Sequence, residues 1–284
     1  MGIARSVASW LIREHQRRPF GGPALVFGRQ HVHVTLDEFR RMVLARGLEP
    51  QPLPPGLSHL TDMPSWDYGL RAGFTSDQAL LWTLAGIEVQ HLDCSEYERA
   101  EYTLDLNQPV PLHLHEQYGV VFDCGTMEHV FDIRSTLQNV DRLVRPEGRV
   151  IHVTQGSNWL DHGYYQFSPV LFYDFYGVNG YENMACWVAD QGVGDPNRTA
   201  WDWYRWPHDG SAPAFLSANP VGVFFTATRK SSAPADHIPR QGQFAARKLF
   251  AAPGAATGWR AILPASIRRV GRRLYWRLKR EERF

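Results

Sequence analysis

Short apolar runs alternate with amphipathic segments along most of the chain, and turn-forming residues separate them. The apolar runs predict buried strands at 24–27, 87–92, 118–122, 149–154, 182–189 and 221–228, with a further short strand that ends at Asp105. Helical periodicity covers 1–19, 35–47, 76–86 and 135–144. Strands that alternate with helices in this way indicate a parallel sheet covered on both faces.

Two of the predicted helices begin with capping residues. Thr35 is followed three residues later by Glu38, which is the capping-box spacing, and Ser76 precedes the helix that closes at Gly86. Between these two helices, residues 48–75 are rich in Pro and Gly and predict a long surface loop or lid.

The composition is that of a globular protein in a reducing compartment. Hydrophobic residues make up 44% and charged residues 21%, and no run approaches the roughly 18 apolar residues of a membrane span. Charged residues interrupt the N-terminal apolar positions, so no signal peptide is expected there. Three cysteines without CxxC spacing argue against a disulfide framework and a zinc knuckle: Cys94, Cys124 and Cys186. We expect a cytoplasmic protein.

The net charge of +1 hides an uneven distribution. Residues 1–19 hold four Arg and one Glu, and residues 265–284 hold eight Arg or Lys and two Glu. The body, 20–264, therefore keeps 18 basic and 26 acidic residues. An acidic body argues against nucleic acid as a ligand, because phosphate binding needs a basic face.

The pattern divides the chain into four parts. These are a basic amphipathic helix at 1–20, a Rossmann-like domain at 21–230, a linker at 231–264 and a basic amphipathic helix at 265–284. The last helix has apolar positions on one side, basic positions around the rest, and Tyr275 and Trp276 able to sit at an interface. That pattern is typical of a helix on an anionic membrane surface, here the inner membrane. Packing on the acidic body or on a second subunit, as in a homodimer, stays open.

In a doubly wound sheet, ligands bind beyond the carboxyl ends of the strands. Asp93 closes one of these strands, and a carboxylate there can accept both hydroxyls of a ribose. The other interpretation is that Asp93 caps the following segment.

At this point the sequence resembles a known family. Phe122-Asp123-Cys124-Gly125-Thr126-Met127-Glu128-His129-Val130, followed by Arg142-Leu143-Val144-Arg145-Pro146-Glu147-Gly148-Arg149, is similar to the second half of class I S-adenosylmethionine-dependent methyltransferases. The segment Asp161-His162-Gly163-Tyr164-Tyr165-Gln166-Phe167-Ser168-Pro169 resembles a subgroup often found with surface-polysaccharide genes. The resemblance covers about 87–190, and more weakly 24–30 and 219–229.

The resemblance implies a role for each matching position. Asp93, with Cys94 beside it, would hold the ribose of S-adenosylmethionine, and Asp105 and Leu106 would lie near the adenine. Gly125 and Thr126 would approach the methionine portion, and Glu128 and His129 would face the transferred methyl group or the substrate. The implied fold is a Rossmann-like, doubly wound, seven-stranded sheet of the class I methyltransferase type.

The turn after the first strand departs from the family pattern. Class I methyltransferases usually carry a glycine-rich turn there, which lets the backbone approach the cofactor. Here Gly28 is followed by Arg29 and Gln30. Either Arg29 or Gln30 contacts the cofactor carboxylate, or cofactor binding is lost.

Histidines supply the candidate bases for methyl transfer to oxygen or nitrogen. His129 and His162 titrate near neutral pH, although each could equally be held by a backbone partner. Tyr165 could position the acceptor or belong to the core. We predict no metal site. His113 and His115 lack further ligands and are interpreted as a polar loop, while Glu128 and His129, being adjacent, rarely point the same way in a regular element.

Aromatic residues gather between 159 and 206. Flat aromatic faces suit sugar rings, while the structural interpretation is a small subdomain with its own core. We expect the cluster 201–206 to be the part that is not fully buried.

The function predicted from these features is S-adenosylmethionine-dependent methyl transfer to a hydroxyl, or an amine, of a sugar-like small molecule or glycan precursor. Two alternatives stay open: non-methyl chemistry on the same fold, and a non-catalytic membrane-associated scaffold with a degenerate cofactor pocket.

Overall fold

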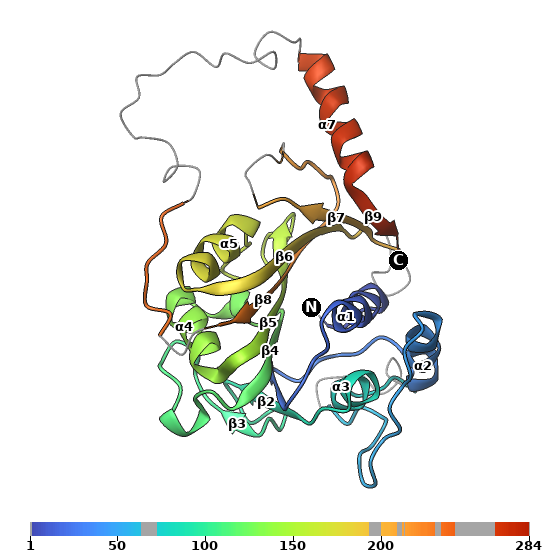
Figure 1. The fold of residues 1–284 in the computed structure, drawn as a ribbon, viewed down its shortest axis with the longest axis vertical. Coiled ribbons are helices and arrows are strands. Elements are labelled where there is room, and N and C mark those ends of the chain that lie inside the picture. The colour runs from blue at the N-terminus through green and yellow to red at the C-terminus, as the bar shows by residue number, and fades with distance from the viewer. Residues whose placement is uncertain are drawn as a thin grey trace.

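A computed structural model describes residues 2–63, 73–192, 200–208, 212, 214–230, 234–241 and 265–283; in the last range, side chains are described only for 270, 271 and 274–280. Its centre is one nine-stranded sheet with the order β3-β2-β1-β4-β5-β8-β6-β7-β9 (Figure 1). The strands are β1 (Ala24–Phe27), β2 (Val89–Asp93), β3 (Tyr102–Thr103), β4 (Tyr118–Cys124), β5 (Val144–Ser157), β6 (Tyr181–Asp190), β7 (Asp202–Trp206), β8 (Val221–Arg229) and β9 (Arg280–Arg283).

The strand directions confirm the predicted fold class. Strands β3, β2, β1, β4 and β5 pair in parallel, and β8 is antiparallel to both β5 and β6. A parallel core followed by an antiparallel hairpin is the Rossmann-like arrangement of class I methyltransferases. Strands β7 and β9 continue the sheet beyond β6 with antiparallel pairing and were not predicted.

Helices cover both faces of the sheet. On one face lie α1 (Arg5–Arg17), α2 (Leu36–Ala45) and α3 (Asp77–Ala85); on the other lie α4 (Ile133–Leu143) and α5 (Pro169–Val178) (Figure 1). The period-2 alternation of each strand divides its side chains between the two cores. In β4, for example, Val120 and Phe122 belong to the first core and Val121 to the second.

The predicted caps are present. The hydroxyl of Thr35 accepts a hydrogen bond from the backbone N–H of Glu38, and the hydroxyl of Ser76 accepts one from Ala79. Gly86 ends α3 in the left-handed conformation. These local signals set helix boundaries close to the predicted ones.

The N-terminal helix is part of the packed unit. Helix α1 buries Trp10 against Trp187 and Trp203 of the sheet, with ring centroids 5.6 and 6.1 Å apart. The buried guanidinium of Arg149 in β5 also lies 3.1 Å from the carboxylate of Glu14. Because both partners are buried, loss of either one would leave an uncompensated charge between the helix and the sheet.

The expectations about the aromatic region hold only in part. In the cluster 201–206, residues 202 and 204–206 are half-buried, as expected, but Trp201 and Trp203 have exposed fractions of 1% and 0%. They also form no separate subdomain core: they pack with Trp10, Trp187 and Phe224 in the core of the main sheet. The reason is that 202–206 forms the added strand β7, which brings these rings onto the sheet face.

The C-terminal helix α7 (Ala265–Lys279) stands away from the body beside β7 and β9 (Figure 1). Its Trp276 is buried against Trp206 and Tyr204, so this ring is engaged within the chain rather than at an outer interface. Of the predicted linker 231–264, only 234–241 falls within the described residues. None of the helices among the residues described is long and apolar enough to cross a membrane.

Candidate functional site

The carboxyl ends of β1, β2 and β4 surround a cavity of about 370 Å³, within the range of small-molecule sites. The parallel register brings Phe27, Leu92 and Asp123 side by side, so the turns that follow them meet. Six of the nine predicted cofactor residues line this cavity: Gly28, Arg29, Gln30, Asp93, Gly125 and Thr126.

Gly28 lies where the turns after β1, β2 and β4 meet, and it lines the cavity. Its φ is +67°, a left-handed value that favours glycine. A Cβ placed on Gly28 would lie 3.5 Å from the hydroxyl of Thr126 and 3.6 Å from Oδ2 of Asp93. Because Gly28 has no side chain, a small space remains between its backbone, the carboxylate of Asp93 at the end of β2 and the hydroxyl of Thr126 in the turn after β4.

The two carboxylate oxygens of Asp93 have different neighbours. Oδ1 accepts hydrogen bonds from the backbone N–H and the hydroxyl of Ser95, at 2.8 and 3.2 Å. Oδ2 faces the space above Gly28. The two interpretations of Asp93 made from the sequence, a local cap and a ligand group, are therefore compatible in one side chain.

The glycine-poor turn is held by Gln30. Its side-chain amide donates to the carbonyl oxygens of Phe27 and Gly28, at 3.0 and 3.1 Å. Gln30 is buried, and its amide nitrogen is engaged with these carbonyls. The side chain thus stabilises the turn that a glycine-rich sequence would form by backbone freedom alone.

Two buried charged side chains, Asp77 and His91, support this turn together with the exposed Glu101. Asp77 Oδ2 accepts from the backbone N–H of Gln30 at 2.8 Å and lies 3.0 Å from Nε2 of His91, whose Nδ1 is 3.0 Å from Glu101. Burial opposes a charge on His91, but the two carboxylates outweigh it and raise the pKa of His91 to about 9. We term Asp77, His91 and Glu101 the His91 network.

The guanidinium of Arg29 ties two loops together beside the cavity. It forms an ion pair with Asp62 and donates to the carbonyl oxygen of Glu98 at 3.3 Å. The hydrogen bond and charge of Arg29 hold the pKa of Asp62 below its usual value. Arg29 thus connects the predicted loop 48–75 to the residues after β2.

Three predicted cofactor residues lie outside the cavity lining. The thiol of Cys94 is on an exposed residue, and burial of the sulfur together with the charge of Asp93 raises its pKa. Oδ1 of Asp105 accepts from the backbone and side chain of Asn107. Leu106 is buried in the second core. The contact of Asp105 and Leu106 with an adenine, and the place of Cys94 beside the ribose, stay predictions.

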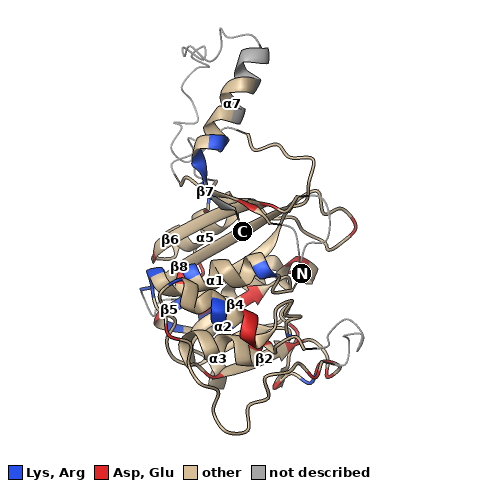
Figure 2. Cartoon of the chain, turned by 90° about the vertical axis from the view of Figure 1, so that its right-hand side faces the viewer, with Lys and Arg blue, Asp and Glu red and all other residues tan. Residues whose placement is uncertain are grey.

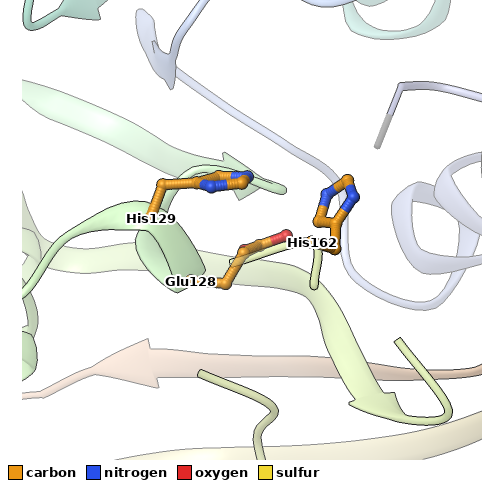
Figure 3. Close-up of side chains that lie close together, drawn as sticks. All are labelled: Glu128, His129 and His162. Carbon is orange, nitrogen blue, oxygen red and sulfur yellow. The ribbon is translucent and has the colours of Figure 1, made fainter. Parts of the chain in front are cut away.

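A second cluster follows directly after Thr126. Glu128, His129 and His162 each offer one ligand atom, and these atoms lie within 4.8 Å of one another (Figure 3). Glu128 and His129 belong to the 3-10 turn Met127–His129, and His162 comes from the loop after β5. Although Glu128 and His129 are adjacent in the chain, their ligand atoms come within this distance, which the sequence did not lead us to expect.

Glu128 is fully buried, yet neither of its carboxylate oxygens has a hydrogen-bond partner among the residues that the structure describes. Burial, and the nearby charge of Asp123, raise the pKa of Glu128 to about 8. Burial lowers the pKa values of His129 and His162, even though both residues are exposed on one side. At pH 7 the three side chains therefore carry little charge.

Asp123 positions the turn that carries Glu128. Its Oδ1 accepts from the backbone N–H groups of Thr126 and Met127, at 3.2 and 3.1 Å. Its Oδ2 is 3.0 Å from Nδ1 of His152, whose Nε2 is 2.6 Å from the hydroxyl of Tyr176. No local pattern in the sequence predicts this buried chain of contacts, because its members lie on three separate elements.

The remaining candidates have structural partners. The hydroxyl of Tyr165 donates to the carbonyl oxygen of Phe131 at 2.7 Å. His113 is exposed, and His115 contacts the carbonyl oxygen of Val110 at 3.2 Å, which fits the polar-loop interpretation. Sequence analysis missed five residues that line the cavity and have no local signal: Gly2, His31, Met63, Glu98 and Cys124.

No family model matches this chain, and no curated protein matches it. Among solved structures, it is similar to a SAM-dependent methyltransferase from Thermotoga maritima described as a possible histamine N-methyltransferase, at 12% identity and a TM-score of 0.38, over 79% of this chain and 89% of that one. It is also similar to the 1,6-didemethyltoxoflavin-N1-methyltransferase of Burkholderia thailandensis, at 10% identity and a TM-score of 0.35, over 79% of this chain and 77% of that one. A SAM-dependent methyltransferase from Archaeoglobus fulgidus matches at 8% identity and a TM-score of 0.39, over 78% and 94%. Likeness of this extent carries no conclusion about activity, and the fold class rests on the strand order itself.

Proposed function

We propose that this protein transfers a methyl group from S-adenosylmethionine to a hydroxyl, or an amine, of a sugar-like acceptor or glycan precursor. The observation that carries the proposal is Oδ2 of Asp93, which faces the glycine space at the joined ends of β1, β2 and β4. A carboxylate in that position suits a ribose diol, and Gly28 leaves room for a ligand to approach the backbone.

The residues present fit this cofactor. Asp93 would hold the ribose hydroxyls, and Gly125 and Thr126 border the same cavity from the end of β4. When bound, S-adenosylmethionine supplies an electrophilic methyl group, whose bond to sulfur breaks with the electron pair kept on sulfur as the acceptor oxygen forms its bond to carbon. Arg29, Gln30, Cys94, Asp105 and Leu106 complete the predicted cofactor set.

Glu128, His129, His162 and Tyr165 make up the acceptor side of the proposal. His129, which follows the cavity turn, and His162, from the loop after β5, are both exposed, so either imidazole can accept the proton that the acceptor hydroxyl loses. The main contribution of the chain is orientation, since an in-line displacement depends on the approach of the two reactants.

Calorimetric titration with S-adenosylmethionine and S-adenosylhomocysteine tests the cofactor site. We expect micromolar binding to the full chain and a loss of at least tenfold in Asp93→Ala. Asp236→Ala is the matched control, because Asp236 is exposed and, within the described part of the chain, its carboxylate forms one ion pair, with the neighbouring His237. No binding of either ligand to folded protein would overturn the proposal and favour the non-catalytic scaffold.

The acceptor class is tested by S-adenosylhomocysteine formation with panels of free sugars, nucleotide sugars and amines. Turnover with hydroxylated sugars supports the proposal, and turnover only with amines or planar aromatics overturns the sugar-like acceptor. Substrate consumption without methyl transfer would point to other chemistry on the same fold.

We also propose that α7 docks on an anionic membrane surface. Its Val270, Leu274 and Leu278 are exposed, and Arg277 and Lys279 lie in its last turn, drawn blue in Figure 2. This combination of apolar and basic side chains is suited to a lipid interface. Vesicles containing phosphatidylglycerol should retain the protein at low salt, and Leu274→Ser with Leu278→Ser should abolish retention. Failure of the unaltered protein to bind, or a homodimer that buries α7, would overturn this proposal.

A further inference from the structure

We infer that Glu128, His129 and His162 form a binding site for a divalent transition-metal ion. The site is distinct from the cavity above Gly28, since none of the three residues lines that cavity. The existence of the site does not depend on methyl transfer, whereas its suggested role, given below, rests on the proposed function.

The first observation is the buried carboxylate without a partner. Buried polar groups in proteins nearly always have a hydrogen-bond partner, and an unpartnered carboxylate carries a large desolvation cost. Both oxygens of Glu128 are in this condition among the described residues, and the carboxylate points toward the two imidazoles (Figure 3). A cation between the three groups would satisfy it.

The second observation is the donor set. Two imidazoles and one carboxylate, with other positions open, are a known ligand combination for divalent transition metals. The two rings have centroids 5.1 Å apart, and the three ligand atoms fall within 4.8 Å of one another. Metal–ligand bonds of roughly 2.0–2.2 Å place donors a little closer than this, so modest side-chain rotations are enough.

The third observation is that the backbone joins the two segments that supply the ligands. The backbone N–H groups of Tyr164 and Tyr165 donate to the carbonyl oxygen of Glu128, at 2.8 and 3.2 Å. A Cβ at Gly163 would lie 2.8 Å from that same oxygen, so only glycine permits the approach. The loop that carries His162 is therefore held on the residue that carries the carboxylate, which preorganises the ligand set.

The donors also indicate the class of ion. Two nitrogen ligands favour Zn²⁺, Co²⁺, Ni²⁺ or Fe²⁺, whereas Mg²⁺ and Ca²⁺ prefer an all-oxygen set. His129 and His162 are exposed while Glu128 is buried, so the open positions face outward. In the proposed reaction, an acceptor hydroxyl held on that open side would become more acidic and release its proton to solvent water, because both imidazoles then serve as ligands.

Metal binding by the full chain tests the inference directly. After treatment with a chelator and its removal, Zn²⁺ is titrated by calorimetry and Co²⁺ by visible absorption, without S-adenosylmethionine or acceptor. We expect one ion per chain, Co²⁺ bands of a low-symmetry nitrogen and oxygen site, and no comparable binding of Mg²⁺ or Ca²⁺. Affinity should fall at least about tenfold in His162→Ala and in Glu128→Gln.

Two further variants sharpen the test. His113→Ala removes an exposed histidine far from the cluster in sequence and should leave binding unchanged. Gly163→Ala keeps all three donors but forces the loop away from Glu128, so it should weaken binding while circular dichroism shows a folded protein. Absence of a one-to-one complex, binding equal for Mg²⁺, or affinity that His162→Ala and Glu128→Gln leave unchanged would each overturn the inference.

Failure here can be told apart from failure of the proposed function. Cofactor binding with no metal binding removes this site and leaves the methyltransferase proposal standing. Metal binding with no cofactor binding supports the site and removes only its suggested role in methyl transfer.

Discussion

The His91 network and the Glu128 cluster are both built from carboxylates and imidazoles, and both adjoin turns that line the cavity. In the network, Asp77 uses both oxygens, one with Gln78 and the other with Gln30 and His91. In the cluster, neither carboxylate oxygen of Glu128 has a hydrogen-bond partner among the described residues. The difference in partners is what separates the two regions: the carboxylate of Asp77 is engaged within the fold, whereas that of Glu128 is not.

The largest expected effect comes from removing the equivalent carboxylate in each region. Asp77→Ala should reduce the free energy of unfolding by about 3–5 kcal/mol, because it leaves the buried His91 charge without its closest partner. Glu128→Gln should change it by less than about 1 kcal/mol, because no contact is lost. Urea unfolding of metal-free protein measures both.

Equal losses in these two variants would contradict the comparison. They would mean that the carboxylate of Glu128 stabilises the fold as much as that of Asp77 does, and that its lack of hydrogen-bond partners does not indicate a ligand site.

A pH titration of stability gives the next largest effect. The pKa of His91 is raised from 6.5 to about 9 in the folded protein, so the folded state binds this proton more tightly than the unfolded state does. The associated stability, about 3 kcal/mol, is fully present below pH 6.5 and is lost as the pH rises through 9. Urea unfolding at a series of pH values from 6 to 9.5 measures this loss.

His91→Gln is the control for this titration. The variant lacks the titrating group, so the difference between the two curves isolates the His91 contribution from that of all other groups. A difference that stays constant between pH 6 and 9.5 would show that the network holds no proton in this range.

The smallest expected effect concerns the contact that joins the two regions. The hydroxyl of Thr126 donates to the carbonyl oxygen of Phe27 at 2.8 Å, which fastens the β4 turn to the end of β1. Thr126→Val keeps the shape and removes this bond, so it should cost about 1 kcal/mol of stability. It should also weaken S-adenosylmethionine binding less than Asp93→Ala does. Thermal unfolding and calorimetry measure the two effects, and a weakening greater than that of Asp93→Ala would contradict the assigned roles.

Local sequence signals account for most of the fold. The strands β1, β2, β4, β6 and β8 are apolar runs, and the caps at Thr35 and Ser76 set where α2 and α3 begin. Helix α5 was missed because Pro169–Val178 is apolar nearly all round and has no polar face to show a helical period. Strand β7 was missed because Asp202–Trp206 mixes aromatic and charged residues, and its burial depends on α1 lying across the sheet.

The residues of the candidate site also fall into two groups, those that local sequence signals predict and those that only the tertiary structure reveals. Gly28, Asp93, Gly125 and Thr126 could be named from the sequence because each follows a strand, and parallel strand ends converge. The two side-chain hydrogen bonds of Gln30 could not be predicted from the sequence, because they depend on where the folded turn places the carbonyl oxygens of Phe27 and Gly28. Glu128 and His129 were named as candidates, but a ligand set with His162 was not predicted.

Apart from α5, β7 and β9, the sequence by itself determined the strands and helices, the turn at Gly28 and the polar residues at the strand ends, because these depend on neighbours in the chain. Only the tertiary structure decided which polar groups find partners. His91 meets Asp77 and Glu101 because β2 packs beside α3, and His162 meets Glu128 because a glycine lets two backbones come within hydrogen-bond distance. Burial then determines the charge state and the partners of these side chains, because an ionisable group away from water must be paired, neutralised by a change in protonation, or bound to a ligand.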